Sequence, residues 1–127
     1  MKRDEAKKIY EERKSKLMAE MVQHIGGHNA ISMAALYQLV YGQQWKNMVN
    51  DTRKIRQLVT KLREEGVPIC SSKRLNNSGY YLAAAGSELT DYTRRSERSA
   101  LGILARNAKI KKISLPDYMG QLRLELS

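Results

Sequence analysis

Several side chains near the middle of the chain can form the paired hydrogen bonds by which proteins recognise base edges in DNA. Arginine pairs with guanine, and glutamine with adenine, through paired hydrogen bonds in the major groove. On a helix that turns about 100° per residue, the row facing farthest from the apolar side is Arg53, Gln57, Thr60 and Glu64. Arg56 and Arg63 flank this row on one side, and two lysines, Lys54 and Lys61, flank it on the other.

These side chains can be ranked as base-contact candidates by how deeply a recognition helix places them in the major groove. Its N-terminal part goes deepest, so the base-reading candidates are Arg53, Arg56, Gln57 and Thr60. Lysine ammonium groups contact phosphates, and the candidates on this part of the chain are Lys46, Lys54 and Lys61. Phosphates repel Glu64 and Glu65, which we expect to stay clear of the backbone.

These side chains need a helix to position them, and the sequence predicts one over 51–65. Its apolar stripe follows a helical spacing and must face the core: Ile55, Leu58, Val59 and Leu62. Asn50 or Asp51 is the expected N-cap, and Gly66 suits the left-handed position just past the end. Any amphipathic surface helix can carry such charges, so the helix alone favours DNA binding and a solvated surface equally.

Two short strand patterns follow the helix, at 67–71 and 79–83, and a polar loop of residues 72–78 separates them. Lys73 and Arg74 make the tip of this predicted hairpin basic. A short helix over 33–41, with Ser32 as N-cap and Gly42 as terminator, comes before the basic helix, and we expect Leu36, Leu39 and Val40 to point inward.

Residues 30–84 resemble winged helix-turn-helix domains, most closely those at the N-terminus of biotin-ligase repressors and related bacterial regulators. The landmarks are the apolar helix ending in Arg-Glu-Glu-Gly, the Val-Pro-Ile strand start and Gly79-Tyr-Tyr-Leu. The resemblance implies that helix 51–65 lies in the major groove, while wing residues touch the backbone or minor groove: Lys73, Arg74 and Asn76. The link from Gly42 to Asn50 departs from the family because it is longer than the usual turn.

Composition agrees with a polyanionic partner. The 127 residues include 23 Lys and Arg against 13 Asp and Glu, a net charge of +10 and a pI near 9.9. Such a charge favours nucleic acid first and an anionic membrane surface second. The single cysteine, Cys70, cannot form an internal disulfide, and no apolar run is long enough to cross a bilayer. We therefore expect a cytoplasmic protein without a membrane span.

Enzymatic interpretations find little support in the chain. His24, His28 and Cys70 lack the spacing of a zinc site, so we expect no metal and no cofactor. There is no phosphate-binding glycine loop, nucleophile elbow or HExxH motif. Tyr80 and Tyr81 are expected to alternate between core and surface as strand neighbours do. We predict a protein that is not an enzyme.

The flanks of the central domain, 30–86, are predicted to be helical. Residues 1–29 hold an amphipathic helix over 3–24, whose charges mostly alternate in sign along the exposed face, which favours a solvated surface over a dedicated nucleic-acid arm. Residues 87–127 hold a long helix, capped by Ser87 and ending at 110–112. This helix together with the N-terminal one is a candidate homodimer contact, and packing within one chain is an equal alternative. The tail, 114–127, fits an edge strand, a docking peptide or a short helix.

Together these features predict a mainly helical winged helix-turn-helix protein with helical extensions that binds double-stranded DNA. The expected role is a small transcriptional regulator, or a DNA accessory factor of a bacterium or phage. Two alternatives remain open at this point: a winged-helix adaptor that binds protein, and an RNA binder.

Overall fold

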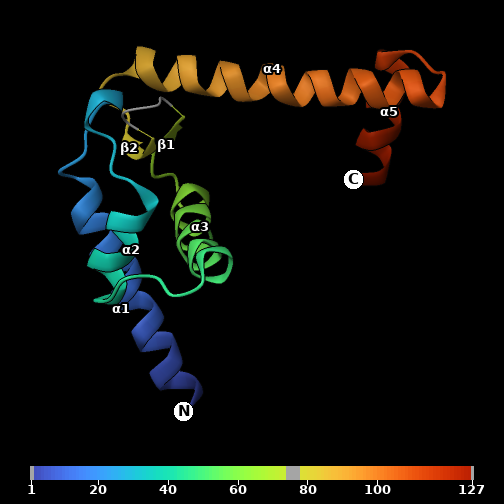
Figure 1. The fold of residues 1–127 in the computed structure, drawn as a ribbon. Helices are drawn as coiled ribbons and strands as arrows, with labels where there is room; N and C mark the ends of the chain where they lie inside the picture. Colours follow the sequence, from blue (N-terminus) through green and yellow to red (C-terminus); the bar gives the residue numbers. More distant parts are fainter. Residues whose placement is uncertain (1, 74–77, 127) are drawn as a thin grey trace. The chain divides into compact units, whose positions relative to one another are not determined.

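The chain folds into helices and one small antiparallel hairpin (Figure 1), as expected for a helix-rich protein. The computed structural model describes residues 2–73 and 78–126. Its elements, in order, are α1 (Arg3–Met21), η1 (Gly27–Asn29), α2 (Met33–Tyr41), α3 (Met48–Glu64), β1 (Ile69–Ser72), β2 (Gly79–Leu82), α4 (Gly86–Lys111) and α5 (Leu115–Leu126). They form two compact units, Met1–Leu89 and Thr90–Ser127.

The first unit is built around α3, against which α1, α2 and β1 pack. The predicted apolar stripe of α3 is confirmed, since each of its four residues is buried: Ile55, Leu58, Val59 and Leu62. α1 contributes Leu17 and Met21 to the same core. The N-terminal helix and the predicted central domain therefore share one hydrophobic core.

α2 has the bounds that its capping residues predict. The Ser32 hydroxyl accepts the Ala35 N–H at 3.2 Å, and Gly42 takes the left-handed conformation at the C-cap. The inward face differs from the prediction at one position, because Leu39 is 53% exposed whereas Tyr37 is buried beside Leu36 and Val40. Tyr37 stacks on Tyr41, with ring centroids 4.5 Å apart.

The hairpin pairs β1 with β2 in antiparallel register, with Ile69 opposite Leu82. The other edge of β2 is also occupied, because Ile25 bridges to Leu82 and Ile31 bridges to Tyr80. This link between α1 and α2 covers β2, so the expected alternation of Tyr80 and Tyr81 between core and surface is wrong. Both tyrosines are buried.

Gly79 permits the close approach of β2 to the link before α2. Its φ is +140°, and an added Cβ would collide with the carbonyl of Ile31 and lie 2.9 Å from the Ser32 Cα. The backbone there makes two hydrogen bonds, Ile31 N–H to the Tyr80 oxygen and Tyr80 N–H to the Ile31 oxygen, each 2.9 Å. Only glycine fits this position without moving the backbone.

α4 starts at Gly86, two residues before the first helical residue that a Ser87 N-cap predicts, so Ser87 lies within its first turn and is not the N-cap. The Glu88 carboxylate binds nearby backbone instead, accepting the Ala84 N–H at 2.7 Å and the Gly27 N–H at 3.2 Å. Glu88 thereby fastens the start of α4 to the segment after α1. A carboxylate in the first turn also suits the positive end of the helix dipole.

The second unit consists of most of α4 together with α5. The chain turns at Lys112, which has a φ of 60°, and the Ile113 N–H donates to the Ala108 oxygen at 3.0 Å. The tail is helical, which decides among the three predicted states. Ala108 and Tyr118 are the buried residues of α4 and α5, so the core of this unit is small.

Candidate nucleic-acid interface

The basic helix begins three residues before its predicted start. Asn47, rather than Asn50 or Asp51, is the N-cap, and its side-chain oxygen accepts the N–H groups of Val49 and Asn50 at 3.1 Å each. Any of the three residue types can cap a helix, so sequence alone does not choose among them. Because α3 starts at Met48, the link between α2 and α3 is limited to residues 42–47.

Asp51 fixes this link onto α3. Its carboxylate is buried and accepts the N–H of Lys46 at 2.8 Å and that of Asn47 at 3.2 Å. The Lys46 N–H hydrogen bond, joined by the bonds from Asn47 and Tyr37 and by the Lys54 charge, holds the pKa of Asp51 below its ordinary value despite partial burial. Asp51 is therefore a structural anion that fixes the link before α3.

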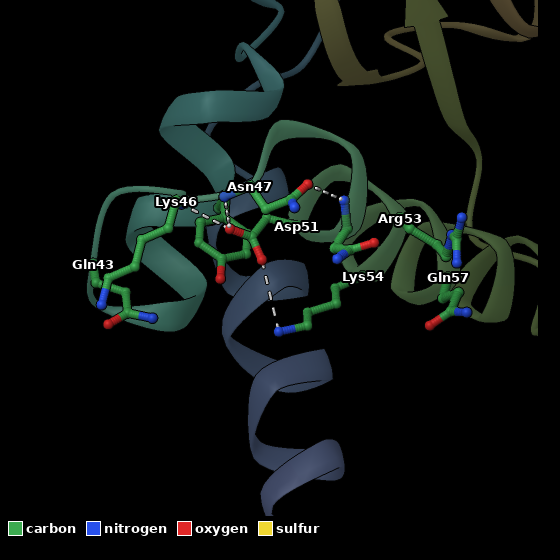
Figure 2. Close-up of a pocket in the computed structure, with 9 residues that line it drawn as sticks. Gln43, Lys46, Asn47, Asp51, Arg53, Lys54 and Gln57 are labelled. Carbon is green, nitrogen blue, oxygen red and sulfur yellow. Dashed lines mark hydrogen bonds and ion pairs between the residues drawn. The ribbon is translucent and has the colours of Figure 1, made fainter.

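An open hollow of about 520 Å³ surrounds the start of α3. Figure 2 shows Gln43 and Lys46 at one side of it, the Asp51 ion pair with Lys54 in the middle, and Arg53 and Gln57 at the other side. Its remaining lining residues are Tyr37, Asn47 and Asn50. The rim is rich in amides and cations, which are the groups that donate hydrogen bonds to bases and phosphates.

A second hollow, of about 390 Å³, runs along the exposed face of α3. All four base-reading candidates line it: Arg53, Arg56, Gln57 and Thr60. The structure thus gathers them on one surface, and each is exposed. Tyr10 of α1 borders the same hollow.

Arg53 and Gln57 line both hollows, which makes them the centre of the surface. Arg56 has a more constrained guanidinium, because its Nη2 donates to the Thr52 hydroxyl at 3.1 Å. Thr52 in turn donates to the Met48 carbonyl at 2.6 Å. This chain of hydrogen bonds pre-positions Arg56 while leaving its side chain exposed.

Two basic residues of α3 have structural partners. The Arg63 Nε donates to the Ile69 carbonyl at 2.8 Å, and its Nη2 donates to the Ser71 hydroxyl at 3.0 Å, so Arg63 joins α3 to β1. Lys54 forms an ion pair of 3.7 Å with Asp51, yet its side chain is about half exposed. Lys54 is therefore partly engaged by Asp51 and partly exposed to a ligand.

The other phosphate-contact candidates fall into two groups. Lys46, Lys61 and Lys73 are exposed, on the link before α3, on α3 and at the end of β1 respectively. Arg74 and Asn76, which the resemblance places on the wing, lie outside the described residues.

Sequence reasoning missed several residues that border the candidate surface. Gln43, Asn47 and Asn50 belong to it only because the helix starts early and the link folds back. The run of polar residues before the apolar stripe was the available signal. Tyr10 has the spacing of a core residue, and it is half-buried against the core while also bordering the second hollow.

The structure gives His24 and Cys70, two of the residues considered as zinc ligands, contacts with other protein groups. His24 contacts the Asn29 carbonyl at 2.8 Å and Glu20 at 3.0 Å, while Cys70 is buried. Within residues 2–73 and 78–126, no three His, Cys, Asp or Glu side chains cluster as metal ligands.

None of the helices in residues 2–73 and 78–126 combines the length and apolar character needed to cross a membrane. Comparison with known proteins gives no match to a family model, a curated protein or a solved structure.

Proposed function

We propose that this protein binds double-stranded DNA through the exposed face of α3, as a small transcriptional regulator or DNA accessory factor. The observation that carries the proposal is the second hollow, where three of the forked base-pairing side chains lie together: Arg53, Arg56 and Gln57. Among the described residues, Glu64 is the one acid that lines that hollow, beside Arg53, Arg56 and Lys61, so its charge favours a polyanion.

The arrangement of the first unit supports a winged helix-turn-helix interpretation. A helix, a bridging segment, two helices and a hairpin follow one another in that order, and the bridging segment pairs with β2. The shortened link of 42–47 brings the chain nearer to the turn of that family than the sequence suggested. In this proposal α3 enters the major groove and the hairpin, with Lys73 exposed at its edge, meets the backbone.

Exposure and contacts support a division of proposed roles among the candidates. Arg53 and Gln57 are the proposed base readers, and Arg56, with Thr52 holding it, supports them at the edge of the groove. Lys46 and Lys61 are the proposed phosphate contacts, because both are exposed and neither forms an ion pair among the described residues.

Selection of bound duplexes from a random pool tests this proposal directly. We expect a preferred sequence, and an affinity that falls steeply with added salt. Arg53→Ala and Gln57→Ala should each weaken the preferred duplex by about 1–3 kcal/mol and relax the preference at one base pair. Lys61→Ala should weaken all duplexes alike and make the salt dependence shallower by about one unit.

The proposal fails if no duplex is enriched and the affinity for random DNA is insensitive to salt. Duplex RNA in competition would reveal an RNA binder if it displaced DNA efficiently. The folded state of each variant can be checked through the fluorescence of Trp45, the single tryptophan, which packs against the core of the first unit.

The second unit supports a homodimer. Its two buried residues provide too small a core for a stable separate fold, and Ile103 and Ile110 are 50% and 72% exposed on one side of α4. The first half of α4 has both signs of charge, whereas residues 99–111 have Arg106, Lys109 and Lys111 but no acid. Antiparallel α4 helices would bring each basic half beside the acids of the other copy.

Sedimentation analysis tests the dimer. Ile103→Asp with Ile110→Asp should give monomers, whereas Leu124→Asp, at a position 79% exposed on α5, should leave the dimer intact. Leu124 and Leu126 are exposed apolar side chains at the C-terminal end of α5. They favour a second candidate function, that of an adaptor that binds another protein. A chain that ignores every duplex but binds a defined protein through these leucines would support the adaptor instead.

A further inference from the structure

Four of the six basic residues of α1 gather on one face when they are placed on the helix. At about 100° per residue, one group lies within about 60° of Tyr10: Arg3, Lys7, Arg13 and Lys14. Four of the five acidic residues of α1 lie about 100° or more away from Tyr10: Asp4, Glu5, Glu11 and Glu12, whereas Glu20, near the end of the helix, lies about 80° away. The alternation of sign along the chain therefore conceals a basic stripe on the helix.

The position of Tyr10 shows which way this stripe faces. Tyr10 borders the hollow that Arg53, Arg56 and Gln57 also line, so its side of α1 adjoins the exposed face of α3. Because Arg3 and Lys7 lie on the same side of α1, toward its N-terminus, they extend the basic surface of α3 onto a second helix.

The four basic residues of the stripe divide by what they contact. Arg13 lies over the ring of Tyr41 at 4.5 Å, and Lys14 pairs with Glu65 at 2.9 Å and with Glu11 at 3.3 Å. These two hold α1 against its neighbours. Arg3 and Lys7 are exposed, and neither takes part in an ion pair among the described residues.

Helix stability does not account for the position of Arg3. A cation in the first turn opposes the helix dipole, which favours the acids Asp4 and Glu5 there. Arg3 and Lys7 also add like charge, and therefore repulsion, to a unit whose α3 already exposes Arg53, Arg56 and Lys61. A bound polyanion removes that repulsion.

We propose that the N-terminal half of α1 is a second DNA-contacting element, in which Arg3 and Lys7 bind phosphates beside the groove that α3 enters. Packed helices lie about 8–10 Å apart, and the major groove is about 12 Å wide. A helix packed alongside α3 therefore meets the phosphate strand that borders the groove. Arg3 lies about 10 Å from Tyr10 along the axis of α1. A phosphate bound by Arg3 would therefore lie farther along the DNA than the phosphates that α3 can contact.

This inference rests on the proposed function, and it assigns α1 a separate role within it. Phosphate contacts set the register and orientation of the protein without reading sequence. Losing Arg3 and Lys7 should therefore lower the affinity for every duplex by the same factor, whereas losing Arg53 or Gln57 should alter which duplex is preferred.

Anisotropy titrations of the full chain with duplex DNA, over a range of salt concentrations, test the proposal. The test variant is Arg3→Gln with Lys7→Gln, and the matched control is Lys8→Gln with Lys16→Gln. Lys8 and Lys16 lie about 160° and 240° from Tyr10, on the opposite side of α1. Both variants remove two positive charges from the same helix.

We expect the test variant to lose about 10-fold in affinity per lost contact at 0.1 M salt, with a slope about 0.9 units shallower for each. The control should change the affinity less than about threefold and keep the slope. Equal losses in both variants would overturn the proposal, because the effect would then be one of net charge.

An unchanged slope in the test variant, together with salt-sensitive binding by the unaltered protein, would overturn the role of α1 and leave the proposed function standing. If the unaltered protein binds no duplex, both proposals fail. Circular dichroism and Trp45 fluorescence of the two variants should match those of the unaltered protein, so a loss of affinity is not a loss of folding.

Discussion

Gly79→Ala tests the packing of the hairpin against the link before α2. The new Cβ would collide with the Ile31 carbonyl, so the backbone of β2 must move away. That movement breaks the two hydrogen bonds between Ile31 and Tyr80, each 2.9 Å long. Both bonds lie at the end of the core where Ile31 and Tyr80 are buried.

The cost can be added from its parts. A non-glycine residue at the φ of +140° found at Gly79 is strained, and strain of this kind costs about 1–3 kcal/mol. Each lost backbone hydrogen bond costs about 0.5–1.5 kcal/mol. The free energy of unfolding should fall by about 2–6 kcal/mol, a large part of the roughly 5–15 kcal/mol that stabilises a typical domain.

Urea denaturation followed by Trp45 fluorescence measures this loss in the first unit, since Trp45 packs against its core. Gly42→Ala and Gly66→Ala are the matched controls. Both glycines have positive φ, +73° and +93°, but an added Cβ there meets nothing within 4 Å. Each control should lose only about 1–2 kcal/mol. A loss for Gly79→Ala no larger than that of the controls would refute the close approach of β2 to Ile31.

Three further predictions concern α3. Asn47→Ala should lower the free energy of unfolding by about 0.5–2 kcal/mol in urea denaturation, because two N–H groups lose their acceptor; equal stability would show that the helix starts elsewhere. Leu58→Ala should lower the free energy of unfolding by about 2–5 kcal/mol in the same assay, since Leu58 is fully surrounded by the core. A loss below about 1 kcal/mol would contradict the burial of Leu58. The pKa of Asp51 is lowered from 3.8 by its Lys46 hydrogen bond, so its contribution is complete above that pH and is lost as pH falls through the lower folded value. In acid titrations monitored by Trp45, Asp51→Asn should therefore flatten the loss of stability below about pH 4, and an unaltered profile would contradict the role of Asp51.

Several features of this protein follow from local chemistry, and for these the sequence was sufficient. The apolar spacing of α3 leaves only one face that can be buried, so its stripe was predicted residue by residue. Ser32 and Gly42 set both ends of α2, because a hydroxyl cap and a left-handed glycine act over a single turn. The same argument placed Arg53, Gln57 and Thr60 on the exposed side of α3.

Other features depended on how the chain folds back on itself, over both short and long separations in sequence. Asn47, Asn50 and Asp51 are equivalent caps by type, and the fold decides among them because the Asp51 carboxylate is engaged by the Lys46 and Asn47 N–H groups. Tyr80 and Tyr81 are both buried because the link between α1 and α2 pairs with the outer edge of β2.

The candidate surface divides in the same way. Its α3 residues were visible in the sequence, because a helix presents every third or fourth residue on one side. For α1 the sequence favoured a solvated surface, and only the packing of α1 against α3 brings Tyr10 to the hollow that Arg53 and Gln57 line. Local periodicity thus determined which side chains each helix presents, and the tertiary contacts decided which helices present them together.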